Sequence, residues 1–233
     1  MNFYEFHFSQ YLQSINQFNL HKYNEKIYDI FHKYPQNMIL YGPPGIGKYS
    51  QAIKFISLFS QSNLKYEKKM SINYEKNEFI FRLSDVHIDI DLNNLGCNSK
   101  LVWNEFFTNV LNFISINKTH FFIICKNFHT IHNELHDVFY SFMQTIPNIK
   151  YKVYFILITS NISFLNPNIL SSSYIINLQR PTKNSYSCFH NIKNIDINTI
   201  TSIKSLKSNT NISTDSFLKC LFNQIIKNNN NFF

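Results

Sequence analysis

Several features are missing from this sequence, and each absence excludes a class of protein. No apolar run is long enough to span a membrane, and the first residues (Met-Asn-Phe-Tyr-Glu-Phe) lack the basic-then-apolar order of a secretion signal. The four cysteines, Cys97, Cys125, Cys188 and Cys220, lie far apart and form no CxxC pair. We therefore expect free thiols in a reducing, intracellular compartment, and no membrane partner.

Glycine and acidic residues are also scarce. The 233 residues include four Gly, and 14 Asp or Glu against 22 Lys or Arg, which gives a formal net charge of +8. This balance favours an acidic partner such as nucleic acid, with a solvated basic surface as the alternative. Abundant Asn, Ile, Lys, Phe and Tyr are typical of an AT-rich coding sequence, so single Asn and Lys residues carry little weight. Hydrophobic residues at 44% predict a folded core.

The most informative stretch is residues 38–59. A short apolar run, Met38–Tyr41, is followed by Gly-Pro-Pro-Gly-Ile-Gly-Lys and then by an amphipathic stretch, Ser50–Phe59. This order predicts a strand, a phosphate-binding loop and a helix. The glycines let successive backbone N–H groups turn toward phosphate oxygens, and Lys48 can reach the β- and γ-phosphates. The helix N-terminus adds positive potential.

The residue after the loop lysine departs from this motif. The motif has Ser or Thr there because a small hydroxyl ligates Mg²⁺, whereas this chain has Tyr49. A phenol places its oxygen much further from the backbone, and Ser50 points about 100° away around the helix. We expect a loop that holds a nucleotide but is impaired as a Mg²⁺ site. A Gly/Pro turn without function is the alternative.

Apolar runs and amphipathic stretches alternate along the rest of the chain, which predicts an α/β, doubly wound parallel sheet. Strands are expected at 38–41, 78–83, 87–92, 120–125, 154–159 and 174–178. Helices are expected at 23–34, 50–59, 99–116, 132–146 and 214–227. A short helix or turn is expected at 167–172, and a loop or frayed helix end at 60–76.

Composition divides the chain into four parts. Residues 1–37 form an N-terminal lead-in, and residues 38–181 a nucleotide-binding domain. Residues 182–227 are richer in Asn, Ser, Lys and Thr and form a short helical, lid-like segment. Residues 228–233 are an Asn-rich tail expected to be disordered.

From the phosphate loop onward, residues 38–181 resemble the AAA+ small subunits of clamp loaders, as in eukaryotic and archaeal replication factor C. Residues 81–96 resemble the strand and turn before the helix that precedes the Walker B strand. Residues 155–161 (Phe-Ile-Leu-Ile-Thr-Ser-Asn) resemble the strand that ends in the sensor 1 asparagine, and residues 169–178 take the place of the Ser-Arg-Cys segment. The resemblance implies a P-loop NTPase fold of the AAA+ type, a three-layer parallel sheet with a short C-terminal helical lid.

The departures from the family bear on mechanism. Lys126 and Asn127 stand where the family's Walker B strand ends in Asp-Glu, and a hydrolytic site needs both carboxylates. Ser173 replaces the arginine that acts on a neighbouring subunit, and Tyr140 and Ser141 replace paired arginines. The resemblance therefore implies that the chain has no catalytic residues and neither hydrolyses ATP nor completes a neighbour's site.

The motif residues that are retained imply a subunit that binds a nucleotide and does not hydrolyse it. The ligand is ATP or ADP, and whether Mg²⁺ accompanies it is left open. The residues expected to hold the nucleotide are Gly42, Pro43, Pro44, Gly45, Ile46, Gly47, Lys48, Tyr49 and Ser50, with Asn161 at the sensor 1 position.

The implied partners are other AAA+ clamp-loader subunits, a sliding clamp and the DNA backbone, in the nucleus or a viral replication compartment. Too few residues follow Pro181 for the family's collar domain, so pentameric assembly of the usual kind is not expected. Lys126 is expected to be buried and is not counted toward DNA binding. The basic residues expected to contact phosphates are Lys183, Lys193, Lys204, Lys207, Lys219 and Lys227.

Two other functions stay open. The chain is an active AAA+ ATPase of the replication factor C type if its metal site is rebuilt from other residues. It is a structural or interaction protein if the P-loop fold serves only as a binding surface.

The sequence His-Asn-Glu-Leu-His at 132–136 is not a zinc-protease motif. Glu134 lies about 200° around a helix from His132, on the opposite face. His129, His132 and His136 could hold a structural metal, but solvated histidines are favoured.

Asp85, Asp89 and Asp91 alternate along a strand. This pattern favours an outward polar face over a carboxylate metal site. Trp103 is expected in the core rather than on a base-stacking surface.

Overall fold

The computed structural model describes most of the chain as far as Pro181. The described residues are 7–17, 19–21, 25–74, 77–114, 120–145 and 152–181. The chain divides into two compact units, Met1–Pro43 with Gly47–Gln179 and Pro44–Ile46 with Arg180–Phe233. The fold below is that of the first unit. The predicted lid, the Asn-rich tail and the six C-terminal lysines lie outside the described residues.

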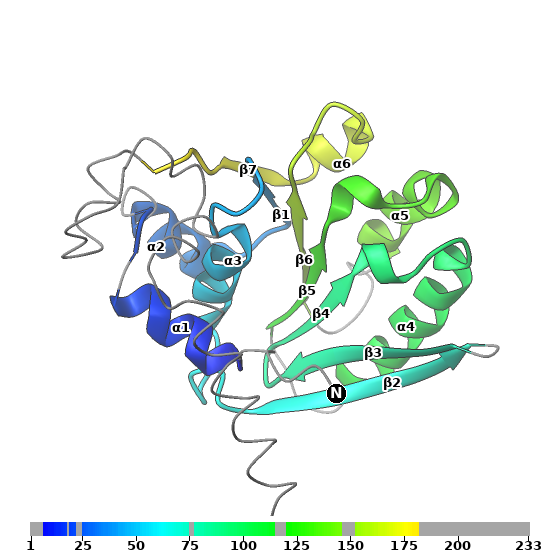
Figure 1. Ribbon diagram of the computed structural model, residues 1–233, viewed down its shortest axis with the longest axis horizontal. Coiled ribbons are helices and arrows are strands. Elements are labelled where there is room, and N and C mark those ends of the chain that lie inside the picture. Colours follow the sequence, from blue (N-terminus) through cyan, green and yellow to red (C-terminus); the bar gives the residue numbers. More distant parts are fainter. Residues whose placement is uncertain are drawn as a thin grey trace, which may run out of the picture. The chain divides into compact units, whose positions relative to one another are not determined.

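A seven-stranded sheet organises this unit, in the order β2-β3-β4-β5-β6-β1-β7 (Figure 1). From β4 to β7 neighbouring strands are parallel, while β2 pairs with β3 and β3 with β4 in antiparallel fashion. The strands are β1 Met38–Tyr41, β2 Glu67–Tyr74, β3 Asn77–Ser84, β4 His87–Asp91, β5 His120–Lys126, β6 Lys152–Thr159 and β7 Tyr174–Asn177.

Helices cover both faces of the sheet, which confirms the predicted three-layer α/β fold. Helices α1 and α2 pack on α3, which contacts β1, β5 and β6, while α4 and α5 pack together on the other face (Figure 1). The helices are α1 Phe8–Gln17, α2 Glu25–Lys33, α3 Lys48–Ser57, α4 Ser99–Ile114, α5 Asn133–Thr145 and α6 Pro167–Ser171, with 3-10 turns η2 Leu92–Asn94 and η3 Phe128–Thr130. No helix in the described part of the chain is long and apolar enough to cross a membrane.

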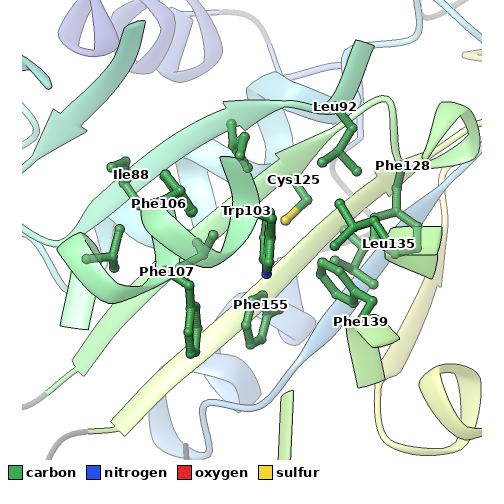
Figure 2. Packing of buried hydrophobic residues seen from close by; sticks show 14 of the residues in the cluster. Ile88, Leu92, Trp103, Phe106, Phe107, Cys125, Phe128, Leu135, Phe139 and Phe155 are labelled. Carbon is green, nitrogen blue, oxygen red and sulfur yellow. The ribbon is translucent and has the colours of Figure 1, made fainter. Parts of the chain in front are cut away.

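The larger core lies between the sheet and the α4–α5 layer (Figure 2). Trp103 is fully buried there, with its ring 5.0 Å from that of Phe139, and Phe139 lies 5.5 Å from Phe155. The predicted core position of Trp103 is confirmed. Cys125 is a buried free thiol in the same core, and Cys97 is an exposed one. Strands buried on both faces read as continuous apolar runs, which is why β5 could be predicted from sequence.

The prediction of a loop or frayed helix end at 60–76 holds for residues 60–66 and is wrong for residues 67–74. Residues 67–74 form β2, which pairs along its whole length with β3. This strand lies at the edge of the sheet and has only one well-buried residue, Ile72. An edge strand tolerates Lys and Glu because much of it faces solvent, so its composition is that of a loop.

The prediction of an outward polar face at Asp85, Asp89 and Asp91 is also wrong. Asp85 precedes β4 and accepts hydrogen bonds from the hydroxyls of Ser60 and Ser62, at 2.7 and 3.0 Å. Asp89 is only 3% exposed, because β4 lies between β3 and β5 inside the sheet. An acid buried in this position needs partners nearby.

Candidate functional site

The phosphate loop joins β1 to α3. Gly45 and Gly47 have positive φ angles of 76° and 90°, in the left-handed region where a side chain would be strained. Gly47 caps α3 without a side-chain hydrogen bond, and the N–H of Gln51 bonds to the Gly47 carbonyl at 3.0 Å. The preceding N–H groups of the first turn therefore have no intrahelical acceptor. This geometry suits an anion, as the sequence predicted.

Lys48 lies over its own loop. Its ammonium donates to the carbonyl oxygens of Gly42 and Pro43, at 2.5 and 2.8 Å. Partial burial lowers the Lys48 pKa from 10.5 to about 8, because desolvation disfavours the charged form. The side chain is still mostly protonated at neutral pH, so a cation is held at the loop.

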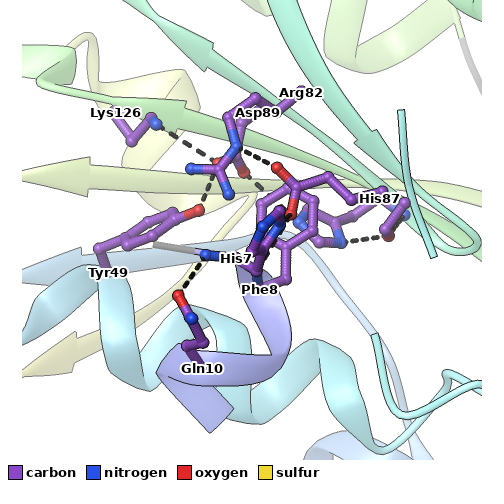
Figure 3. Close-up of polar contacts among 10 residues, drawn as sticks. His7, Phe8, Gln10, Tyr49, Arg82, His87, Asp89 and Lys126 are labelled. Carbon is purple, nitrogen blue, oxygen red and sulfur yellow. Dashed lines mark hydrogen bonds and ion pairs between the residues drawn. The ribbon is translucent and has the colours of Figure 1, made fainter. Parts of the chain in front are cut away.

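Tyr49 reaches across from α3 to the middle of the sheet (Figure 3). Its hydroxyl donates to Oδ2 of Asp89 on β4, and the Lys126 ammonium lies 3.3 Å from the same oxygen. That ammonium also lies 4.8 Å from the centroid of the Tyr49 ring, within cation–π range. We call Tyr49, Asp89 and Lys126 the phenol–lysine cluster. Burial and then the negative charge of Asp89 raise the Tyr49 pKa well above its usual value, so the phenol stays protonated.

The second oxygen of Asp89 faces a buried histidine. Oδ1 lies 3.5 Å from Nε2 of His87, and neither atom has a hydrogen-bond partner among the described residues. Burial lowers the His87 pKa to about 4, a shift that the Asp89 charge only partly opposes. His87 is therefore neutral at physiological pH, and its Nδ1 pairs with the Ser84 hydroxyl at 2.5 Å.

Arg82 supplies a further positive charge near the phenol–lysine cluster, opposite Asp89 in the β3–β4 register. Its Nε donates to Oε1 of Glu67 at 2.8 Å, and its guanidinium lies 4.4 Å from the Phe8 ring centroid (Figure 3). Burial opposes ionisation of Glu67, but the hydrogen bond and charge of Arg82 outweigh it and lower the Glu67 pKa. Glu67 Oε2 also accepts from the Phe8 N–H at 3.3 Å, which fixes the start of α1 against β2.

These residues do not fit Mg²⁺. Asp89 is the carboxylate nearest to the start of α3 in this network, and its oxygen is already shared by a phenol and an ammonium. Asn127 turns away and donates to Oδ1 of Asp91 at 2.9 Å. Among the residues that the structure describes, no three His, Cys, Asp or Glu side chains gather as a metal site requires. A lysine beside the only carboxylate of the cluster repels a dication.

Asn161 lies at the same end of the sheet as the loop. It follows β6, where Thr159 is in register with Tyr41, the residue before Gly42. Its Oδ1 accepts from the backbone N–H and the hydroxyl of Ser163, at 2.9 and 2.8 Å. The amide nitrogen is the group left to donate to a ligand.

The three histidines of the metal alternative do not share a site. His132 precedes α5, and His129 belongs to η3. Nε2 of His136 accepts from the N–H of Asn166 at 3.3 Å. Ser173, at the predicted arginine position, lies between α6 and β7.

Sequence reasoning missed Asp89 as a site residue. A signal was present, because His-Ile-Asp-Ile-Asp alternates in a strand that pairs with β5. The two isoleucines face the α4–α5 core, so the acids must face the α3 side.

Comparison with solved structures bears on the fold, whereas comparison by sequence finds no match. No protein-family model matches the sequence, and no curated protein matches it significantly. Among solved structures, a chain of the E. coli MS115-1 HORMA–CdnC–Trip13 complex is 14% identical, with a TM-score of 0.53 over 82% of this chain and 71% of that chain. The fold is that of the AAA+ P-loop ATPases.

Two further structures have lower TM-scores. C. elegans PCH-2 is 18% identical, with a TM-score of 0.44 over 77% of this chain and 44% of that chain. The Thermotoga maritima RuvB Holliday junction branch migration motor is 13% identical, with a TM-score of 0.45 over 72% of this chain and 48% of that chain. The chain spans about half the length of these AAA+ proteins.

Proposed function

We propose that this protein binds ATP or ADP at the phosphate loop without hydrolysing it, as a clamp-loader-like AAA+ subunit in DNA replication. The observation that carries the non-catalytic part is the phenol–lysine cluster, because a phenol and an ammonium hold the carboxylate beside the loop helix. The AAA+ fold supports the proposal that the protein binds a nucleotide.

Binding is supported by the groups that remain at the loop. The first turn of α3 offers N–H donors and positive potential to phosphate oxygens, and Lys48 supplies a cation on a flexible stem. Asn161 lies at the same sheet end with its amide nitrogen available. These groups need only the small movement of Lys48 away from two backbone carbonyls.

Hydrolysis is disfavoured at two points. Without Mg²⁺ the site lacks several kcal/mol of transition-state charge stabilisation. Asn127 replaces the carboxylate that orients the attacking water, and its amide is bonded to Asp91. A chain of this kind contributes to an assembly by binding and contact, while neighbouring AAA+ subunits hydrolyse.

The test of binding is a thermal shift with ATP and ADP on the purified full chain. Nucleotide at about 100 times its dissociation constant stabilises a protein by about 2.7 kcal/mol. For a domain of this size that is a rise of roughly 5–10 °C in melting temperature. Lys48→Ala is expected to abolish the shift, while Lys152→Ala, at the other end of the sheet, preserves it. The rate of phosphate release from ATP is expected to equal that measured in buffer without protein.

One observation favours a second function, an interaction protein on an inherited fold. Lys48 is already satisfied by Gly42 and Pro43, as in a loop closed on itself. Absence of any nucleotide effect on melting would establish this second function. Mg²⁺-dependent hydrolysis abolished by Lys48→Ala would instead establish an active ATPase.

The replication role is tested by recovering the tagged protein from its native cell. We expect intact AAA+ subunits or a sliding clamp to be retained in moderate salt and identified by mass spectrometry. DNA affinity is expected to fall steeply with salt, because basic residues displace counterions from phosphates. Recovery of the protein alone, with a flat salt response, would contradict the role.

A further inference from the structure

We propose that Lys126, positioned by Tyr49 and Asp89, takes the place of Mg²⁺, so that the protein binds a nucleotide without its metal ion. The inference rests on the proposed nucleotide binding and adds the chemical form of the ligand. The inference predicts that Mg²⁺ weakens the binding of nucleotide to this protein. A site that uses Mg²⁺ as a ligand would instead bind nucleotide more tightly when the ion is present.

The first step is the position of the ammonium. Lys126 ends β5, and its Nζ lies 4.8 Å from the ring of Tyr49, the second residue of α3. Tyr49 follows Lys48, whose ammonium donates to the loop carbonyls of Gly42 and Pro43. Lys126 on β5 therefore contacts the side chain of the residue that follows the loop lysine.

The second step is how the ammonium is held. Asp89 Oδ2 accepts from the Tyr49 hydroxyl and lies 3.3 Å from Lys126, so both partners are fixed on one oxygen. Asp89 is 2% exposed at its side chain, and its carboxylate is desolvated. A desolvated carboxylate with two donors is a rigid anchor rather than a free ligand.

The third step is access. The Lys126 side chain is 25% exposed, whereas that of Asp89 is 2% exposed. An ammonium has three donors, so Lys126 can bond to Asp89 and still contact a phosphate oxygen.

The fourth step is charge. The cluster combines one carboxylate with one ammonium, and the neighbouring His87 is neutral. A Mg²⁺ ion entering here would meet Lys126 and Arg82 nearby and a carboxylate already used. The metal therefore stays on the nucleotide in solution, and only the metal-free fraction binds.

The experiment is calorimetric titration of the full chain with ADP, in EDTA and in excess Mg²⁺. We expect binding in EDTA and weaker binding in Mg²⁺, because the ion sequesters free ADP. Binding that is tighter in Mg²⁺ would overturn the inference and leave the proposed function standing. Absence of binding in both buffers would overturn both.

Two variants test the assignment to Lys126. Lys126→Met removes the ammonium and keeps an unbranched apolar stem of similar volume. It is expected to weaken ADP binding in EDTA about tenfold, equivalent to about 1.4 kcal/mol. Lys152→Met is the matched control, since Lys152 begins β6 at the opposite end of the sheet. Equal affinity of Lys126→Met and wild type in EDTA would overturn the inference.

A rebuilt site gives the reverse result. Combining Tyr49→Thr with Lys126→Asp restores a small hydroxyl and a carboxylate, so Mg²⁺ is expected to tighten ADP binding. The melting temperature of this double variant is expected to rise with Mg²⁺ alone, while that of the wild type does not. A wild-type rise with Mg²⁺ alone would show a metal site and overturn the inference.

Discussion

The hydrogen bond from Tyr49 to Asp89 is expected to stabilise the fold measurably. Tyr49→Phe removes only the hydroxyl and keeps the ring, which lies edge-on to Tyr11 at 5.0 Å and beside Lys126. Because the acceptor is a buried carboxylate, we expect a loss of about 1.5–3 kcal/mol in the free energy of unfolding. At about 2–4 °C per kcal/mol, the melting temperature falls by roughly 3–12 °C.

The loss stays in this range because Asp89 keeps a partner. Lys126 still lies 3.3 Å from its Oδ2, so the carboxylate is not left unpaired in the variant. The assay is urea unfolding, in which the midpoint is expected to fall and the slope to stay unchanged.

A double-mutant cycle with Asp89→Asn isolates the pair. A coupling free energy of about 0.5–3 kcal/mol is expected between the two sites. A Tyr49→Phe protein as stable as wild type would refute the reasoning. So would two destabilising single variants whose effects add without coupling.

Three further predictions follow from the burial of single side chains. Burial lowers the His87 pKa to about 4, so its contribution to the free energy of unfolding is fully present above pH 6.5 and falls by about 3 kcal/mol as the pH drops toward 4. An NMR titration in which His87 of the folded protein is protonated near pH 6.5 would contradict this. Phe139→Ala, which empties a fully buried position, is expected to cost about 3–5 kcal/mol in chemical denaturation. The exposed Ile80→Ala is its control and should change stability by less than about 0.5 kcal/mol. Alkylation followed by peptide mapping should modify Cys97 in the native protein and Cys125 only after unfolding, because burial raises the Cys125 pKa and blocks access.

Most of the parallel sheet could be predicted from the sequence, because its strands are buried on both faces. β5 and β6 read as continuous apolar runs, and the loop between β1 and α3 has a motif of fixed spacing. The edge strand β2 could not be predicted in this way, because it gains its structure by pairing with β3 and leaves polar side chains in solvent.

The site could be predicted only in part. Tyr49 and Lys126 were recognised one at a time, as residues unsuited to Mg²⁺. Their joint partner, Asp89, lies 40 residues from Tyr49 and 37 from Lys126. The contact depends on the order of strands and on which residues of β4 face the α3 side of the sheet. Those are properties of tertiary packing, which local patterns do not encode.

The place of β1 in the sheet sets the order in which the protein folds during synthesis. Although β1 is the first strand in the described part of the chain, it pairs with β6 and β7, the last two strands described there. The Asn37 side chain accepts a hydrogen bond from the N–H of Phe155, 118 residues later, at 2.9 Å. The partners β2 and β3 are neighbours in the sequence, whereas the strand before the phosphate loop pairs only with strands made more than 100 residues later. Long-range parallel pairing of this kind is slow. A ribosome-bound chain halted before β6 is therefore expected to lack a folded nucleotide loop.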